Sequence, residues 1–493
     1  MTVAKKNQDF VKYFKKNDET VSNDTGRREK KSGTGKGKTA SKTGEAQNRA
    51  ASKDSDRKKK GLSKPGEDKR KAGFRYEESG SRAVSKSKGF GDRGKTSYKN
   101  DEIVEKDKKP SRCPVSKKCG ACQMIDMEYH KQLKIKHDRV QELLNDYCTV
   151  ESFIGMEHPE NYRCKVHAVF THDKKGNPVS GIYKEGTHEV VPVKECLLED
   201  KKADAIIATI RGMLKSFKIK TFDEDNGYGL LRHVLIRVGH NSGEIMVVLV
   251  LTSPILPSKN NFVKALRDKH PEITTIVVNV NDKQTSMILG DKEKAIYGPG
   301  YITDTMCGMK FKISPKSFYQ VNPVQTELLY NKAIELADLK GKERVLDCYC
   351  GVGTIGIIAS KKAGEVIGVE LNQDAVKDAI INAKMNEVKN ITFYQNDASK
   401  FMLQMADAGE KVDVVFMDPP RSGSTPVFLQ AMFRLAPTRV VYISCSPDSL
   451  ANDLEIITTH GYKVEKAIPV DMFPFTRSVE TVVLLTKTGS SKG

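Results

Sequence analysis

Residues 344–356 read RVLDCYCGVGTIG, a short apolar strand pattern followed by a loop that is rich in glycine. A helical pattern comes next, and glycine lets the backbone approach a ligand at the N-terminus of a helix. Nineteen residues beyond Gly351, the following strand pattern ends at Glu370. A carboxylate at that position accepts hydrogen bonds from both hydroxyls of a ribose. The unit therefore predicts an α/β fold with a nucleotide-like ligand at the carboxyl ends of its strands.

The same alternation of strand and helical patterns extends over residues 323–493. Such alternation is typical of a parallel sheet covered by helices on both faces. We therefore predict a C-terminal Rossmann-like domain. Its strands are expected at residues 344–346, 365–369, 391–394, 412–417, 440–443, 462–469 and 481–485.

Two carboxylates distinguish between the possible cofactors. A G-x-G-x-x-G loop alone fits either NAD or S-adenosylmethionine. Asp347, directly before the glycines, favours S-adenosylmethionine, because it can hold the ammonium of a zwitterion where NAD would bring a pyrophosphate. Asp418 begins the sequence Asp-Pro-Pro-Arg after the strand at 412–417, and the prolines stiffen that loop over the reactive end of the cofactor.

Residues 440–447 read VVYISCSP and place Cys445 at the carboxyl end of another strand, just before a helical pattern. A nearby helix N-terminus lowers the pKa of a thiol and favours the thiolate. We interpret Cys445 as a covalent nucleophile; the alternative is a small buried hydrophobe. Glu480 opens the last strand of the same sheet, where a solvated glutamate is the alternative interpretation.

Three cysteines follow one another closely, in a C-x5-C-x2-C pattern, and a fourth lies farther along the chain. Four thiolates suit either an iron–sulfur cluster or tetrahedral zinc, and the spacing does not separate the two. Ten cysteines in a chain of this kind indicate metal or catalytic roles and not a disulfide framework. The candidate ligands are Cys113, Cys119, Cys122 and Cys196.

The charge of the chain is uneven. Residues 1–100 hold 29 Lys and Arg against 13 Asp and Glu, while the remainder is nearly neutral. We predict that residues 1–108 form a disordered basic arm, because their few apolar side chains cannot offset chain entropy. Such an arm attracts polyphosphates. No apolar run is long enough to span a membrane and the charged N-terminus does not resemble a secretory signal, so we expect a cytoplasmic protein with no membrane partner.

Residues 109–322 are predicted to contain the cysteine segment and a central, mostly antiparallel α+β module. A helix is expected at 129–147, with Leu133, Val140, Leu143 and Leu144 on one side. Further helices are expected at 203–217 and 260–269, and strands at 166–170, 234–238, 245–251 and 273–280.

Together these motifs resemble the RNA uracil-5-methyltransferase family of the RumA/TrmA type, from about Cys113 to the C-terminus. Residues 318–322, which read FYQVN, belong to the resemblance. It implies a [4Fe–4S] cluster on Cys113, Cys119, Cys122 and Cys196, and S-adenosylmethionine bound by Gln320, Tyr349, Glu370 and Asp418. It also implies Cys445 as nucleophile and Glu480 as base. Thr354 and Asp397 fall where relatives contact the cofactor, but their residue types differ and we do not include them.

The resemblance implies methylation of carbon 5 of a uridine in RNA through a covalent bond from the cysteine to carbon 6. We expect 23S ribosomal RNA as the substrate, because the bacterial transfer-RNA enzymes that resemble TrmA lack the cluster. A transfer-RNA uracil-5-methyltransferase and a non-catalytic RNA-binding factor are the alternatives, and an RNA cytosine-5 enzyme shares the covalent logic. An amino-group methyltransferase would need no cysteine. We expect a monomer, and a cluster that supports the RNA-binding module.

Overall fold

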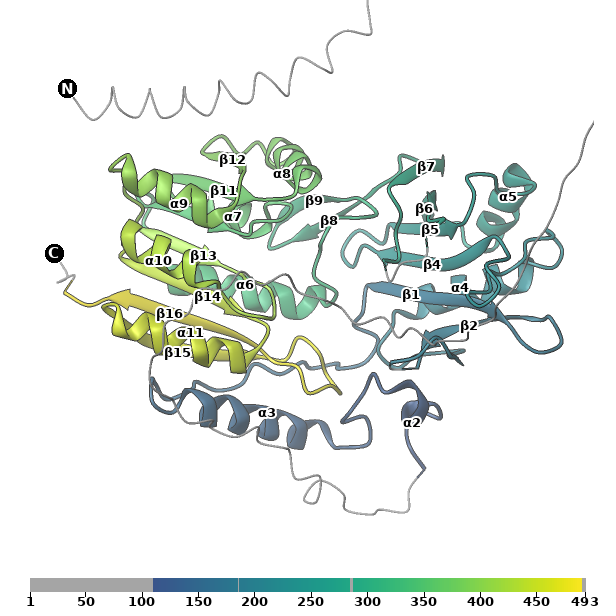
Figure 1. Cartoon of the computed structure of the whole chain (residues 1–493), viewed down its shortest axis with the longest axis horizontal. Coiled ribbons are helices and arrows are strands. Elements are labelled where there is room, and N and C mark those ends of the chain that lie inside the picture. Colours follow the sequence, from purple (N-terminus) through teal and green to yellow (C-terminus); the bar gives the residue numbers. More distant parts are fainter. Residues whose placement is uncertain (1–109, 185, 284–286, 490–493) are drawn as a thin grey trace, which may run out of the picture. The chain divides into compact units, whose positions relative to one another are not determined.

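The computed structural model describes residues 110–184, 186–283 and 287–489, which fall within one compact unit (Figure 1). The predicted basic arm lies outside the described residues. Among the described helices, none combines the length and the apolar character needed to cross a membrane.

The C-terminal half contains a seven-stranded sheet in the order β12-β11-β10-β13-β14-β16-β15. The order reverses direction between β10 and β13, and this is where open α/β sheets form their ligand crevice. The sheet confirms the predicted α/β fold class. Its strands are β10 (Arg344–Cys348), β11 (Glu365–Glu370), β12 (Ile391–Gln395), β13 (Val414–Met417), β14 (Arg439–Ser444), β15 (Tyr462–Val470) and β16 (Glu480–Lys487).

The alternation of strands and helices predicted a parallel sheet, but one strand of this sheet is antiparallel. β16 runs antiparallel to both of its neighbours, β14 and β15. The physical reason is the short connection: residues 471–479 join β15 to β16 without a crossover helix, and a parallel return would need one.

Helices cover both faces of this sheet (Figure 1). The three helices α6, α7 and α8 share one apolar core with the sheet, and α9 packs beside α10 on the other face. Their bounds are α6 (Pro323–Ala337), α7 (Thr354–Ala359), α8 (Gln373–Met385), α9 (Ala398–Asp407), α10 (Pro426–Leu435) and α11 (Pro447–Thr459).

The central module contains a second seven-stranded sheet, ordered β3-β2-β1-β4-β5-β6-β7. All neighbours pair antiparallel except β5 and β6, which are joined through a helix and pair parallel. Two helices, α4 (Lys201–Met213) and α5 (Lys259–Lys269), pack on it. Its strands are β1 (Lys165–His172), β2 (Pro178–Tyr183), β3 (Val190–Pro192), β4 (Leu231–Val238), β5 (Ile245–Leu251), β6 (Ile273–Val280) and β7 (Lys292–Tyr297).

A hairpin of β8 (Ile302–Met306) and β9 (Met309–Ile313) leads from the central sheet toward α6 and packs against α8. Side chains of β4 and β5 share one apolar core with the helices of the C-terminal sheet. The domain boundary between residues 322 and 323 stays a prediction.

The cysteine segment contains α2 (Ser116–Cys119), and the helix α3 (Tyr129–Leu144) follows it. α3 packs beside α11, at the β15 edge of the C-terminal sheet (Figure 1). Its buried face differs from the predicted one, because Leu133 and Leu143 are only partly buried. The buried residues of α3 are Gln132, Lys136, Val140 and Leu144.

Candidate active site

A cavity of about 680 Å³ lies at the carboxyl ends of β10, β11, β13 and β14, where the strand order reverses. The six residues predicted for cofactor binding and catalysis all line it. They are Gln320, Tyr349, Glu370, Asp418, Cys445 and Glu480.

The glycine loop after β10 needs backbone conformations that side chains disfavour. Gly351 and Gly353 have φ angles of 55° and 81°, and Tyr349 has a φ of 61°. A Cβ on Gly353 would lie 2.7 Å from the Phe393 ring, so this position is closed to any side chain unless the ring moves. Thr354, which we had not included, follows directly and lines the cavity.

Asp347 has a structural contact that the sequence did not indicate. Its buried Oδ2 accepts a hydrogen bond of 2.8 Å from the backbone N–H of Gly356, in the first turn of α7. Burial raises the pKa of Asp347 to about 7, with smaller contributions from Asp418 and Glu370. The carboxyl group therefore anchors the glycine loop, and its contact with the ammonium of the cofactor stays a prediction.

Glu370 also holds the loop, but it faces the cavity. Its Oε2 accepts from the N–H of Gly351 at 3.0 Å, and its Oε1 accepts from the N–H of Asn372 at 2.8 Å. A carboxylate has about four lone-pair sites, so two remain for further donors. The orientation of this carboxylate is thus fixed before any ligand binds.

The three other side chains predicted for cofactor binding also line the cavity. Tyr349 stacks on Phe428 with ring centroids 5.2 Å apart, and Gln320 hydrogen-bonds the buried hydroxyl of Tyr330. Burial raises the pKa of Asp418 to about 7. The loop after Asp418 is fixed by Asp453, whose Oδ2 accepts from the Ser424 N–H at 2.8 Å.

Strand register brings Cys445 and Glu480 to the same end of the sheet, where both line the cavity. Ser444, the last residue of β14, pairs with Thr481 of β16, and Cys445 and Glu480 each lie one position beyond this pair. Ser444 Oγ accepts from the N–H of Ser446 at 3.2 Å, which fixes the turn that carries Cys445.

The pKa of the Cys445 thiol differs from the predicted direction. Burial, with smaller contributions from Glu480 and Asp418, raises it to about 11, and Arg421 opposes this rise. The cysteine precedes the N-cap of α11, so it lies outside the first turn of that helix, while two carboxyl groups share its cavity. Burial also raises the pKa of Glu480 well above its usual range.

Several lining residues were not predicted. Phe318 lines the cavity with 67% of its surface exposed, although it lies in the FYQVN sequence that was already noted. Arg163 and the segment with Phe473, Thr476 and Ser478 also line it, and no sequence motif marks them. Asp397, which we had not included, caps α9 by accepting from the N–H of Lys400.

A second cavity, of about 450 Å³, is lined by all four predicted ligand cysteines. Cys113, Cys119, Cys122 and Cys196 are free thiols. Within the ranges that the structure describes, no three His, Cys, Asp or Glu side chains converge closely enough to hold a metal ion. The four cysteines therefore line one cavity, and their role as metal or cluster ligands stays a prediction.

The two cavities are adjacent. Ala121, Arg163 and Val321 line both of them. Burial raises the pKa of Cys122 and Cys196 to about 12, and nearby thiols add to the effect. The charged residues Arg163, Lys165, Glu195 and Glu199 also line the cysteine cavity.

Comparison with known proteins identifies the family. The model of the tRNA (uracil-5-)-methyltransferase family matches residues 128–488. The chain belongs to this family. Uncharacterised RNA methyltransferases of Halalkalibacterium halodurans and Clostridium tetani are both 40% identical to it over 384 residues; the first alignment covers 77% of this chain and 84% of the relative, the second 77% and 83%.

A solved structure agrees with this assignment. The tRNA (uracil-54, C5)-methyltransferase of Pyrococcus abyssi, in complex with S-adenosyl-L-homocysteine, superposes with a TM-score of 0.64 and 26% identity, over 75% of this chain and 86% of the other. The chain is thus an RNA methyltransferase of the uracil-5 family with S-adenosylmethionine as cofactor. The resemblance inferred from the motifs is confirmed.

The raised pKa of Asp418 predicts a pH-dependent change in stability. A carboxyl whose pKa rises from 3.8 to about 7 on folding destabilises the folded state progressively between those two pH values, and fully above them, by at most about 4 kcal/mol. In thermal melts of the ligand-free protein, Asp418→Asn should therefore gain Tm relative to wild type as pH rises from 4 to 8.

Asp291→Asn is the matched control, because Lys283 lowers the pKa of this exposed carboxyl. Its Tm difference from wild type should move the other way or stay constant with pH. A Tm difference for Asp418→Asn that does not change with pH would contradict the raised pKa.

Proposed function

We propose that the protein methylates carbon 5 of a uridine in RNA through a covalent bond between Cys445 and carbon 6 of the base. The observation that carries this proposal is the position of Cys445 and Glu480, each one residue beyond the last pair of β14 and β16, in the cavity that Asp418 and Glu370 also line. The addition step needs a nucleophile at carbon 6 of the base, and the elimination step needs a base at the neighbouring carbon 5.

The covalent route follows from the weak nucleophilicity of carbon 5. The Cys445 sulfur adds to carbon 6, and the electrons of the 5,6 double bond move toward the carbonyl at carbon 4, which makes carbon 5 an enolate carbon. Carbon 5 then takes a methyl group, which S-adenosylmethionine supplies when bound. Glu480 removes the proton from carbon 5, the bond from sulfur to carbon 6 breaks, and the double bond forms again.

The raised pKa values in the cavity favour the role of Glu480 as a base but not the role of Cys445 as a nucleophile. A raised pKa makes the Glu480 carboxylate a stronger base. The thiol of Cys445, with its pKa near 11, must lose its proton before it attacks. Arg421, which lowers this pKa, stabilises the thiolate.

The residues of the cofactor side fit a nucleoside with a charged amino-acid tail. Glu370 is oriented by two backbone N–H groups and has acceptor sites left for ribose hydroxyls. We propose that Gln320, Tyr349 and Asp418 complete this binding site. Asp418 lies between the glycine loop and Cys445, where it would align the donor with the base.

RNA must deliver an unstacked base to reach the thiol. Phe318 is an exposed aromatic side chain at the cavity, and such side chains stack on bases that leave a helix. We propose that Phe318 and Arg163 hold the nucleotide at the entrance. A loop or a single-stranded segment is the expected target.

We propose 23S ribosomal RNA as the substrate, with transfer RNA as the second candidate. The four-cysteine set favours ribosomal RNA, whereas the Pyrococcus abyssi protein that superposes on this chain is a transfer-RNA enzyme. We further propose that the enzyme acts as a cytoplasmic monomer.

We propose a [4Fe–4S] cluster in the cysteine cavity, with zinc as the alternative. Four free thiols around one volume, with Arg163 and Lys165 beside them, suit an anionic cluster bound at four corners. A single zinc ion would require the four sulfurs to converge on a centre roughly 2.3 Å from each.

Two substitutions test the covalent route. Cys445→Ala should abolish methylation and the covalent RNA adduct, because no other group can add to carbon 6. Glu480→Gln should instead accumulate the adduct, since the proton at carbon 5 remains. Denaturing gels with labelled RNA detect the adduct, and methyl transfer is counted in parallel; full activity of Cys445→Ala would refute the nucleophile.

The substrate is tested by mapping 5-methyluridine in a strain that lacks the gene. We expect the modification to disappear from 23S ribosomal RNA and to persist in transfer RNA. The opposite result would identify transfer RNA as the substrate, and 5-methylcytidine as the missing nucleoside would exclude the uracil reaction.

The cluster is tested on anaerobically purified protein. We expect visible thiolate-to-iron absorption bands and about four irons per chain. Cys122→Ser should reduce both. A colourless protein with one bound zinc would favour the alternative.

A further inference from the structure

The segment 471–479 connects β15 to β16 and ends at Glu480. It has no regular secondary structure along most of its length, yet Asp471, Met472 and Phe475 are almost completely buried. Phe473, Thr476 and Ser478 line the cavity of the candidate active site. The conformation of this segment therefore sets both the wall of the cavity and the start of the strand that carries the base.

A buried segment without secondary structure needs partners for its backbone polar groups, and here side chains of other elements supply them. Gln132 Oε1 of α3 accepts from the Phe475 N–H at 3.0 Å. Asn322 and Gln325, at the start of α6, donate to the carbonyl oxygens of Met472 and Asp471 at 3.0 and 3.1 Å.

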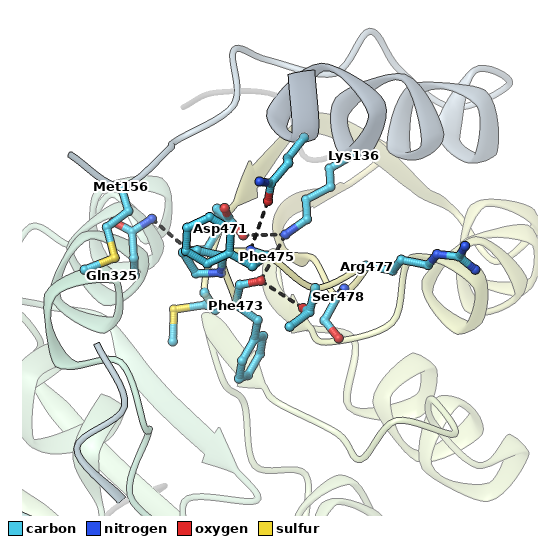
Figure 2. Close-up of polar contacts among 12 residues, drawn as sticks. Lys136, Met156, Gln325, Asp471, Phe473, Phe475, Arg477 and Ser478 are labelled. Atoms are coloured by element: carbon cyan, nitrogen blue, oxygen red, sulfur yellow. Dashed lines mark hydrogen bonds and ion pairs between the residues drawn. The ribbon is translucent and has the colours of Figure 1, made fainter. Parts of the chain in front are cut away.

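Lys136 adds an ion pair with Asp471 to these contacts, as Figure 2 shows. Its Nζ lies 2.6 Å from Asp471 Oδ1 and 3.1 Å from the carbonyl oxygen of Phe473. Both charged side chains are buried, with 1% and 0% of their surfaces exposed. The second oxygen of Asp471 accepts from the hydroxyl of Tyr129 at 2.8 Å. One ammonium of α3 thus binds the first and the third residue of the segment.

Burying the Lys136 ammonium without the Asp471 carboxylate would cost free energy, so the two groups must stay in contact in the folded protein. Cys445 is positioned separately, by β14 and by the Ser444–Ser446 turn. A disturbance at Lys136 therefore reaches Glu480 through the segment and leaves the thiol in place.

We propose that Lys136 is a positioning residue for Glu480: together with Asp471 and Tyr129, it fixes segment 471–479 so that the base meets the proton at carbon 5. This inference rests on the proposed function and deepens it. Loss of the contact should slow the step that needs the base, while addition of the thiol and binding of the cofactor continue.

The experiment compares Lys136→Met with wild type and Glu480→Gln, at a temperature well below the Tm of each variant. We expect Lys136→Met to lower kcat for methylation by about 10- to 100-fold, because small misplacements of a catalytic group have effects of this size. The covalent adduct should accumulate as it does in Glu480→Gln. The Kd of S-adenosylhomocysteine, measured by calorimetry, should stay within about threefold of wild type, because the four residues proposed for cofactor binding are untouched.

Arg139→Met is the matched control. Arg139 lies on the same helix and forms an ion pair with Asp448 of α11, so its loss weakens the packing of α3 without touching Asp471. It should change Tm without accumulating adduct. If both variants accumulate adduct equally, the effect comes from helix packing and the inference is wrong.

Tyr129→Phe provides a second variant that removes one hydroxyl only, and it decides the matter if Lys136→Met does not fold. We expect a smaller accumulation of adduct with a Tm close to that of wild type. Normal turnover in every folded variant, with adduct in Glu480→Gln, would overturn the inference and leave the proposed function standing. A wild type without adduct or methylation would refute the proposed function, and the inference with it.

Discussion

The strands β14 and β16 are hydrogen-bonded and antiparallel, so the carboxyl end of β14 lies beside the amino end of β16. This pairing brings Cys445 and Glu480, which are far apart in the sequence, to one cavity. A slip of one residue would turn every side chain of β16 to the other face of the sheet. The register is held by apolar side chains on both strands, among them Val441, Ile443 and Val482, which belong to the shared core. The chemistry of the site thus depends on the packing of the sheet below it.

Much of this architecture could be predicted because the spacing of apolar residues along the chain indicates each strand and helix. Every strand expected in the C-terminal sheet is present, with ends within two residues of those predicted. Strand order reverses next to β10, so residues at the ends of β10, β11, β13 and β14 had to meet. Reading strand ends was therefore enough to bring Tyr349, Glu370, Asp418 and Cys445 to one cavity.

Other features depend on tertiary contacts that no local pattern shows. Lys136 and Gln132 look like solvent-facing residues of α3, yet both are buried because segment 471–479 lies against that face. The hydrogen bond from the N–H of Gly356 to Asp347 is another contact of this kind. The pKa of Cys445 depends on Glu480 and Asp418, whose distance from the thiol is set by the fold. The sequence therefore predicts which residues lie in one site, but it predicts their side-chain contacts less well.

The role expected for the cysteine cavity also changes with the fold. Support of the RNA-binding module was the interpretation from sequence, but the cysteine segment contacts the wall of the active site as well. The N–H of Met124 donates to the carbonyl oxygen of Phe475 at 3.0 Å, and the guanidinium of Arg112 lies 5.2 Å from the centroid of its ring.

Phe475 also packs in one apolar cluster with Tyr162 and with the partly buried thiols Cys113, Cys122 and Cys196. Its φ of 66° is unfavourable for a side chain of this size, so surrounding contacts must maintain it. Those contacts come from α3 on one side and from the cysteine segment on the other. Three of the four cysteines therefore pack in the same cluster as the residue that lies five positions before Glu480.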